Sequence, residues 1–382
     1  MLLALAIATL GFCLVAAERL LRGVRRLPRL PLVPPRAPSS GWPRVSVIVP
    51  ARNEASTIRV ALQSVLGQDY PDYDVVVLDD RSDDGTGALL DEMAATSPRL
   101  RVVHLHELPA GWLGKNYALH QGARSASGSI LLFTDADVIL DPSTLRRAVA
   151  ALIAAQADHL TAIPGVILRS LALDAFLGSF SLFFSLFYRV WDVRDPRRSA
   201  YLGIGAFNMV RADVYRAIGT HAAIAMRPDD DMKLGKLIKR AGFRTEVVLG
   251  DPCVRVEWYP SLRALVDGLM KNTFAGLDYR VRNTVLAVVA QCALNVWPFI
   301  ALVATRGAAQ WLNAAAVLVI LVVYADHARH HGFRPWLAIA HPCSSLLMSY
   351  ILVRATVLTL ARDGIAWRGT RYPLAALRAN RV

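Results

Sequence analysis

The sequence predicts an α/β domain with a mostly parallel sheet and helices on both faces, plus apolar helices that cross a membrane at both ends of the chain. Three observations support this fold class. Between residues 45 and 134, short apolar runs alternate with segments of helical periodicity, which implies parallel strands. The longest uncharged apolar stretches lie towards the two termini, and polar clusters follow three of the expected strands.

Composition limits the class of protein. The 382 residues are 54% hydrophobic and 19% charged, with a formal net charge of +13. Soluble domains contain about 25% charged residues, so a plain cytosolic enzyme is not expected, and so apolar a chain is not disordered. The basic excess suggests an anionic partner, which could be nucleic acid, an anionic membrane or a phosphorylated substrate. The four cysteines are scattered and match neither a disulfide framework nor a zinc site, so we expect reduced, buried thiols.

Residues 1–18 are a predicted transmembrane anchor. Basic residues follow this apolar run, whereas they would precede it in a signal peptide. Because basic residues tend to stay in the cytoplasm, we expect the N-terminus outside and the following domain inside. Residues 19–44 are a predicted basic, proline-rich linker, stiff and not folded, with prolines at Pro31, Pro34, Pro35, Pro38 and Pro43.

The next boundaries follow from changes in composition. We expect a catalytic domain over 45–280, a C-terminal transmembrane region over 281–362 and a basic tail over 363–382. Within 45–280, Leu171–Val190 is rich in Leu and Phe and is followed by arginines. This pattern suits a helix lying on the membrane surface, with a helix of the domain core as the alternative.

The C-terminal region has two or three predicted spans. Thr284–Ala304 and Trp311–Ala325 are expected to cross, whereas Pro335–Ala361 is either a span or a re-entrant pair that turns at His341-Pro342. The positive-inside rule leaves this open, because the tail and the loop Asp326–Arg334 are both basic. The three histidines of that loop are expected to face solvent or lipid headgroups instead of binding a metal.

The strand ends of the central domain predict its ligand site. Strands are expected at 45–49, 74–78, 100–105 and 130–134, and helices at 54–67, 85–96 and 117–126. In parallel sheets, ligands bind beyond the carboxyl ends of the strands. Polar clusters occur there after three strands, namely Arg52-Asn53-Glu54, Asp79-Asp80-Arg81-Ser82 and Asp135-Ala136-Asp137. Neither common glycine-rich phosphate loop is present, but Asp135 and Asp137 could hold a divalent cation, Mg²⁺ or Mn²⁺, that binds substrate phosphates.

Three segments resemble the family 2 glycosyltransferases, namely Val47–Glu54, Leu78–Thr86 and Phe133–Asp137. Three more matches strengthen this resemblance: Gly111–Asn116, near the donor diphosphate in that family, Gly203–Asn208 on the acceptor side, and the acidic pair Asp230-Asp231. The matching stretch runs from about 45 to 279. The resemblance implies the GT-A fold, a nucleotide-binding α/β domain.

The resemblance also implies roles on the donor side. Pro50, Arg52 and Glu54 would line the base and ribose, and Asp79, with Asp80 beside it, would pair with uracil. Lys115 would pair with a phosphate, where a plain surface lysine is the alternative. Asp135 would face the nucleotide and sugar, with Asp137 as the more direct metal ligand. Helix capping before 85–96 is the alternative explanation of the Asp79-Asp80 pair.

On the acceptor side, the resemblance implies that Asp231 removes a proton from the acceptor hydroxyl as C1 of the sugar is attacked, with Asp230 as the second choice. One direct displacement inverts the anomeric centre. An N-cap for a helix over 232–241 could coexist with this role. Gly205, Asn208 and Trp258 would lie on the acceptor side, although Trp258 could equally be a core or interface aromatic.

Taken together, the chain is expected to be a hexosyltransferase of the bacterial cell membrane with a cytoplasmic catalytic domain. It would move one sugar, with glucose from a UDP-linked donor as the first choice, to the hydroxyl of a membrane lipid such as a carotenoid or other polyprenoid. Its arrangement resembles the carotenoid and hopanoid-associated glycosyltransferases of bacteria. A processive polysaccharide synthase is the first alternative, weakened because Q-x-x-R-W is absent. A membrane scaffold or transporter would not need three acidic clusters, and a nucleic-acid partner is not expected because the basic residues flank membrane segments.

Overall fold

The computed structural model describes residues 2–31, 38 and 41–382, so the predicted linker residues Pro34 and Pro35 lie outside the described residues. The chain divides into two compact units. One, here called the α/β unit, comprises Leu27–Ile167, Asp192–Glu257 and Ala366–Val382. The other, the helical unit, comprises Met1–Arg26, Leu168–Trp191 and Trp258–Ile365. Leu168–Trp191 and the segment from Trp258 therefore belong with the apolar helices, and most of the basic tail belongs with the sheet. These divisions differ from the domain boundaries expected from composition.

A seven-stranded sheet forms the centre of the α/β unit, in the order β3-β2-β1-β4-β8-β6-β9. Its strands in chain order are β1 (Val45–Ala51), β2 (Tyr73–Asp80), β3 (Leu100–Leu105), β4 (Ile130–Phe133), β6 (His159–Ile163), β8 (Asn208–Arg211) and β9 (Thr245–Leu249). The first four are mutually parallel, as the sequence predicts. Strand β8 is antiparallel to both of its neighbours, β4 and β6.

Helices and two small sheets complete this unit. The helices are α2 (Ile58–Leu66), α3 (Thr86–Thr96), α4 (Gly114–Ser125), α5 (Thr144–Ala154), α7 (Ala212–Ala217), η2 (His221–Ile224), α8 (Asp230–Arg240) and α14 (Leu374–Ala379). The small sheets are β5 (Val138–Leu140) with β10 (Val254–Val256) and β7 (Gly165–Val166), and the hairpin of β11 (Gly364–Trp367) and β12 (Thr370–Pro373).

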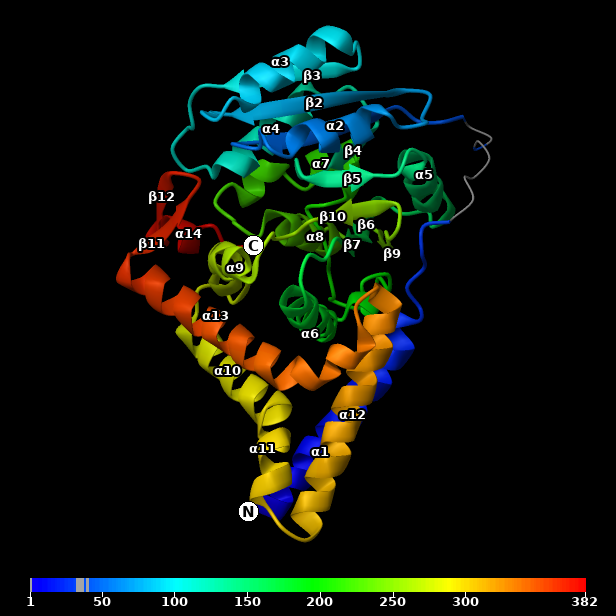
Figure 1. Cartoon of the computed structure of the whole chain (residues 1–382). Coiled ribbons are helices and arrows are strands. Elements are labelled where there is room, and N and C mark those ends of the chain that lie inside the picture. Colours follow the sequence, from blue (N-terminus) through cyan, green and yellow to red (C-terminus); the bar gives the residue numbers. More distant parts are fainter. Residues whose placement is uncertain (1, 32–37, 39–40) are drawn as a thin grey trace. The chain divides into compact units, whose positions relative to one another are not determined.

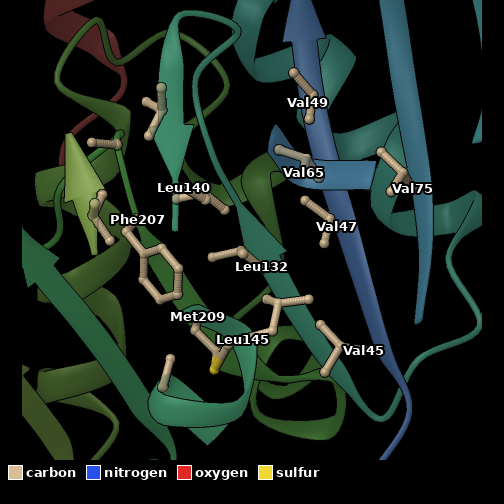
Figure 2. Packing of buried hydrophobic residues seen from close by; sticks show 14 of the residues in the cluster. Val45, Val47, Val49, Val65, Val75, Leu132, Leu140, Leu145, Phe207 and Met209 are labelled. Carbon is tan, nitrogen blue, oxygen red and sulfur yellow. The ribbon is translucent and has the colours of Figure 1, made fainter. Parts of the chain in front are cut away.

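Alternating side chains of the strands bury both faces of the sheet. Val45, Val47 and Val49 of β1 point into one core, which also contains Phe207 and Met209 (Figure 2). Ile48 lies in the core of the opposite face with Leu78 and the residues of α4. Helix α4 approaches this face so closely that a Cβ on Gly122 would lie 2.5 Å from Cγ2 of Ile48. Helices therefore cover both faces, as expected for parallel strands.

Apolar helices make up the helical unit. They are α1 (Leu2–Val24), α6 (Leu171–Tyr188), α9 (Leu262–Gly276), α10 (Val281–Asn295), α11 (Trp297–Ala304), α12 (Ala308–His331) and α13 (His341–Ala361). Figure 1 shows α1, in blue, running beside α12, in orange, and an ion pair of 2.7 Å joins Arg25 to Asp326 at this contact. Helix α1 extends six residues beyond the predicted anchor.

Among the described residues, four segments are long and apolar enough to cross a membrane, namely Leu2–Val24, Leu171–Tyr188, Ala308–His331 and Pro335–Ala361. The pair α10 and α11 would be a fifth, bent by 43° at the break between them. Helix α13 runs unbroken from His341, and Pro342 occupies its first turn, where proline fits a helix. The bend therefore lies between α10 and α11 and not at the His341-Pro342 pair.

Two local expectations were wrong. The predicted histidine loop is the C-terminal end of α12, where His327 is buried and Ser181 Oγ lies 2.9 Å from its Nε2. The part of the predicted linker that precedes residue 32 is ordered. Leu30 is only 2% exposed, and its N–H donates to the Leu249 carbonyl at 3.1 Å, which adds Leu30 to the edge of β9.

Of the cysteines, Cys13 and Cys253 are buried as expected, whereas Cys343 is exposed.

Candidate active site

A small pocket lies at the carboxyl end of β4. Its polar lining comes from segments far apart in sequence, among them Lys115 of α4, Asp135 after β4, Gly205 and Asn208 at the start of β8, and Asp230 and Asp231 of α8. The parallel strands bring the first two segments to one edge, and antiparallel β8 brings its own N-terminal end to the same edge. Residues that are up to 116 positions apart in sequence thus meet in one place.

Lys115 is the cation of this pocket. Its Nζ lies 2.7 Å from Asp135 Oδ1 and 3.6 Å from Asp230 Oδ2, and its side chain is 19% exposed. Burial would lower the pKa of Lys115, but the charges of Asp135, Asp230 and Asp231 outweigh it and raise the pKa. Lys115 therefore stays positively charged, as a phosphate-pairing residue must.

Asp231 is fixed by two backbone groups. Its Oδ2 accepts from the Gly205 N–H at 2.8 Å, and its Oδ1 accepts from the Met232 N–H at 2.7 Å. Burial nevertheless raises the pKa of Asp231 above the ordinary value. A carboxylate that is held rigidly and has a raised pKa is suited to accept a proton. The Gly205 carbonyl also accepts from the Asp135 N–H at 3.1 Å, so one residue links the Asp231 carboxylate to the backbone of Asp135.

The expected capping role of the acidic run is only partly met. Helix α8 begins at Asp230, and the Asp229 side chain makes no capping hydrogen bond. Its carboxylate instead receives both guanidinium nitrogens of Arg227, at 2.9 and 3.0 Å. The next two acids of the run, Asp230 and Asp231, line the pocket.

Asp137 lies in a crowded acidic setting. Burial raises its pKa to about 7, and the negative charges of Asp135 and Glu54 add to this effect. Among the described residues, no group of three or more His, Cys, Asp or Glu is placed to hold a metal by itself. Two carboxylates one residue apart, with like charges nearby, nevertheless fit a hard divalent cation whose remaining ligands are phosphate oxygens and water. The donor set thus fits the expected cation.

The loops after β1 and β2 are joined to each other. Asn53 exchanges hydrogen bonds with Asp83 through its amide, and the Glu54 N–H donates to Thr86 Oγ1 at 2.9 Å. Pro50 lies within β1, paired in register with Leu78 of β2. The structure therefore places the predicted donor residues of the two strands side by side.

Both acids at the end of β2 have basic partners. Asp79 lies 2.9 Å from Nδ1 of His104, and this contact, with a second one to Asp91, raises the pKa of His104. Asp80 receives two nitrogens of Arg81 at 2.7 and 3.1 Å, with Arg52 at 3.6 Å. Both carboxylates thus lie in direct contact with basic side chains at the carboxyl edge of the sheet.

The predicted acceptor residues do not all lie together. Asn208 lines the pocket, but its Oδ1 forms a short hydrogen bond with Nε2 of the buried His159. Trp258 belongs to the helical unit, where its ring packs edge to face on Phe180 with centroids 5.0 Å apart. This contact is that of a packing aromatic, and the acceptor role of Trp258 stays a prediction.

Sequence reasoning missed several residues at this edge. His221 lines the pocket from η2, and burial lowers its pKa to about 3, which keeps it neutral. Asn116 holds η2 in place by donating to the carbonyls of Ile224 and Arg227 at 2.8 and 2.9 Å. Arg368 of the tail contacts Glu54 at 2.5 Å. Only Asn116 had a signal in the sequence, through its place next to Lys115.

Comparisons with known proteins agree with this architecture. The model of Glycosyl transferase family 2 matches residues 46–219. A 4,4'-diaponeurosporenoate glycosyltransferase of Staphylococcus aureus (strain MRSA252) is 24% identical over 347 residues, covering 86% of this chain and 88% of that protein. The protein of the same name from strain bovine RF122 / ET3-1 is 24% identical over 354 residues, with the same coverage.

A solved structure shows the same fold. The mannosyltransferase PcManGT from Pyrobaculum calidifontis, in complex with GDP-Man and Mn2+, superposes with a TM-score of 0.56 at 22% identity, covering 95% of this chain and 99% of that one. The fold predicted from the sequence, a GT-A domain with apolar helices at both ends, is therefore confirmed. Residues 46–219 thus match a glycosyl transferase family 2 domain, and the chain is a glycosyltransferase.

Proposed function

We propose that this enzyme transfers one sugar from a nucleotide-sugar donor to the hydroxyl of a membrane lipid, with inversion at C1. The observation that carries the proposal is the pocket that gathers Lys115, Asp135 and Asp231 at the carboxyl edge of the sheet. Glucose from a UDP-linked donor and a carotenoid or other polyprenoid acceptor are the substrates we favour. The relatives named for diaponeurosporenoate support a lipid of this class.

In the proposed reaction, the acceptor oxygen attacks C1 of the sugar as the bond from C1 to the diphosphate oxygen breaks. The acceptor proton passes to the Asp231 carboxylate, and the diphosphate leaves with the bonding electron pair. Lys115 pairs with the negative charge that develops on the leaving group. Asp137, with Asp135, would hold Mg²⁺ or Mn²⁺, which supplies further charge neutralisation on the diphosphate. The Mn2+ in the solved mannosyltransferase supports this choice of ion.

We further propose that the donor is bound by Pro50, Arg52, Glu54, Asp79 and Asp80, at the ends of β1 and β2. The links between these two loops support a common binding surface for base and ribose. Gly205 and Asn208 would line the acceptor side. The apolar helices would anchor the enzyme in a bacterial membrane, with the α/β unit in the cytoplasm, where nucleotide sugars are made.

The name of the relatives raises a second acceptor chemistry, because diaponeurosporenoate is a carboxylate. A carboxylate is already ionised at neutral pH and needs no base to become a nucleophile. A hydroxyl acceptor would give a glycoside, which withstands mild alkali, whereas a carboxylate acceptor would give a glycosyl ester, which hydrolyses. We favour the hydroxyl because Asp231 is held in place with a raised pKa.

Mass spectrometry of lipids tests the proposal. Lipids from cells that express the full chain are compared with lipids from cells that express Asp137→Ala, before and after mild alkali. We expect one lipid class to gain the mass of a single hexose only with the unchanged protein, and the gain to survive alkali. A ladder of hexose additions would indicate the processive alternative, and an unchanged lipid profile would contradict lipid transfer.

A further inference from the structure

The basic tail folds onto the α/β unit instead of extending into solvent. From Ala366 onwards it belongs to that unit, and Tyr372, Leu374 and Leu377 are buried at 5%, 4% and 0% exposure. Strand β12 and helix α14 account for most of its length. The tail is therefore packed onto the α/β unit through buried apolar side chains.

The first contact is made by the turn between β11 and β12. Arg368 Nη2 lies 2.5 Å from Glu54 Oε1, and its Nη1 donates to the carbonyl of Arg52. Gly369 follows with a φ of +78°, which turns the chain back at Arg52. One guanidinium thus holds both the side chain and the backbone of the loop that follows β1. A forked pair of this kind fixes geometry better than a single contact does.

The second contact reaches the segment that carries Lys115. The Tyr372 hydroxyl accepts from the Gly114 N–H at 3.3 Å. Gly114 packs so tightly on the end of β2 that a Cβ there would lie 2.2 Å from Asp80 Oδ2. The tail thereby braces the start of α4 where it meets the acids of β2.

A third set of contacts lies beside α8 and η2. The Asn380 side chain accepts from the Met226 N–H and donates to the Ala223 carbonyl, both at 3.0 Å. Lys236 Nζ of α8 donates to the Val382 carbonyl at 2.6 Å. The tail therefore contacts the loop after β1 and three elements that carry pocket residues, namely α4, η2 and α8.

We propose that the tail is part of the nucleotide-binding site, with Arg368 as a positioning residue for Glu54 and the β1 loop, and with Tyr372 as one for the start of α4. This inference rests on the proposed donor site. Arg368 offsets the charge of Glu54 and keeps its loop in the shape that the base and ribose need. Its loss would weaken donor binding and leave the chemical step largely intact.

The test measures binding of UDP and of GDP, each with Mn²⁺, to the full-length protein in detergent, together with KM and kcat for transfer. For Arg368→Gln we expect the Kd of the bound nucleotide and the donor KM to rise roughly ten- to hundredfold, as for loss of a hydrogen bond to a charged group, with kcat within threefold. Arg368→Lys keeps the positive charge but cannot make both guanidinium contacts. Its Kd and donor KM should therefore lie between those of the unchanged protein and those of Arg368→Gln. Tyr372→Phe should raise Kd by a smaller factor.

Arg381→Gln is the matched control, because it removes the same charge from an exposed position of the same tail. It should bind nucleotide like the unchanged protein. The double variant Arg368→Gln with Glu54→Gln should bind nucleotide no more weakly than whichever single variant binds it more weakly, because both single changes break the same Arg368–Glu54 contact. Unchanged Kd and KM in Arg368→Gln, while the unchanged protein binds nucleotide, would overturn this inference alone. Failure of the unchanged protein to bind either nucleotide would overturn the proposed function as well.

Discussion

Asp231→Asn separates the proposed chemistry from folding more sharply than any other change. The carboxylate accepts one backbone N–H on each oxygen, from Gly205 at 2.8 Å and from Met232 at 2.7 Å. An asparagine of the same shape offers one oxygen to these two donors and turns its NH₂ towards the other. One N–H is then unsatisfied, which costs about 1–3 kcal/mol of folding free energy. The melting temperature should fall by a few degrees without loss of the fold.

The effect on catalysis should be much larger. The amide cannot accept the acceptor proton, and positioned bases contribute typically 10²- to 10⁴-fold, so kcat should fall by about that factor. Donor KM should change little, because Asp231 has no proposed contact with the nucleotide. The assay is the initial rate of transfer in purified membranes at saturating donor, with a thermal melt of the same preparation.

Asp230→Asn provides the comparison. Asp230 Oδ2 lies 3.6 Å from Lys115 Nζ, so its neutralisation changes the electrostatics of the pocket without removing the base. We expect a loss of about tenfold, which corresponds to roughly 1.4 kcal/mol of transition-state stabilisation. A large loss in Asp230→Asn with near-normal rates in Asp231→Asn would reverse the two assignments. Near-normal rates in both would refute a general base and favour an acceptor that is already ionised.

Four further predictions concern the same edge and the sheet behind it. Because burial raises the pKa of Asp231, the rate should begin to fall at a higher pH on acidification than an ordinary aspartate would allow; a flat profile down to pH 4 would contradict this. In Gly205→Ala the new Cβ would lie 2.6 Å from Asp135 Oδ2, so transfer should drop at least tenfold, while Gly11→Ala, whose new Cβ meets open space without a positive φ, should not alter the pocket. Burial lowers the pKa of His159 to about 4, so the folded state favours the neutral imidazole. The free energy of unfolding should therefore be highest above pH 6.5 and should fall by roughly 3 kcal/mol as the pH drops towards 4, because the unfolded chain binds the proton first. His159→Gln should flatten this part of the pH dependence of unfolding. EDTA should stop transfer and added Mn²⁺ or Mg²⁺ should restore it, whereas full activity in EDTA would exclude the cation.

The parallel half of the sheet could be predicted because each of its strands is a continuous apolar run that ends in polar residues. Val45–Val49 and the run before Asp79 are buried on both faces, and this leaves a clear signal. Strand β8 had no such signal. Its four residues, Asn208–Arg211, begin and end with polar side chains, and it forms a strand because β4 and β6 lie on either side of it. Long-range pairing overrides local propensity at such places.

The tail was missed for a related reason. Composition predicted only a basic tail, without helices or strands. Leu374 and Leu377 are spaced like one face of a helix and are buried, but two positions do not distinguish a docked helix from chance. The contact of Arg368 with Glu54 spans 314 positions, and no local pattern announces it.

The contacts at the carboxyl edge also bear on the proposed role of Asp137 as a ligand of the cation. Asp80 is paired with Arg81, Asp79 with His104, Glu54 with Arg368, and Asp135 with Lys115. Asp137 is the acid whose pKa rises to about 7, because burial and the remaining negative charges disfavour its ionised form. A divalent ion there would reverse that balance by favouring the carboxylate. The basic excess of the chain thus has a local counterpart, since Arg81, His104, Lys115 and Arg368 partner the other acids at this edge.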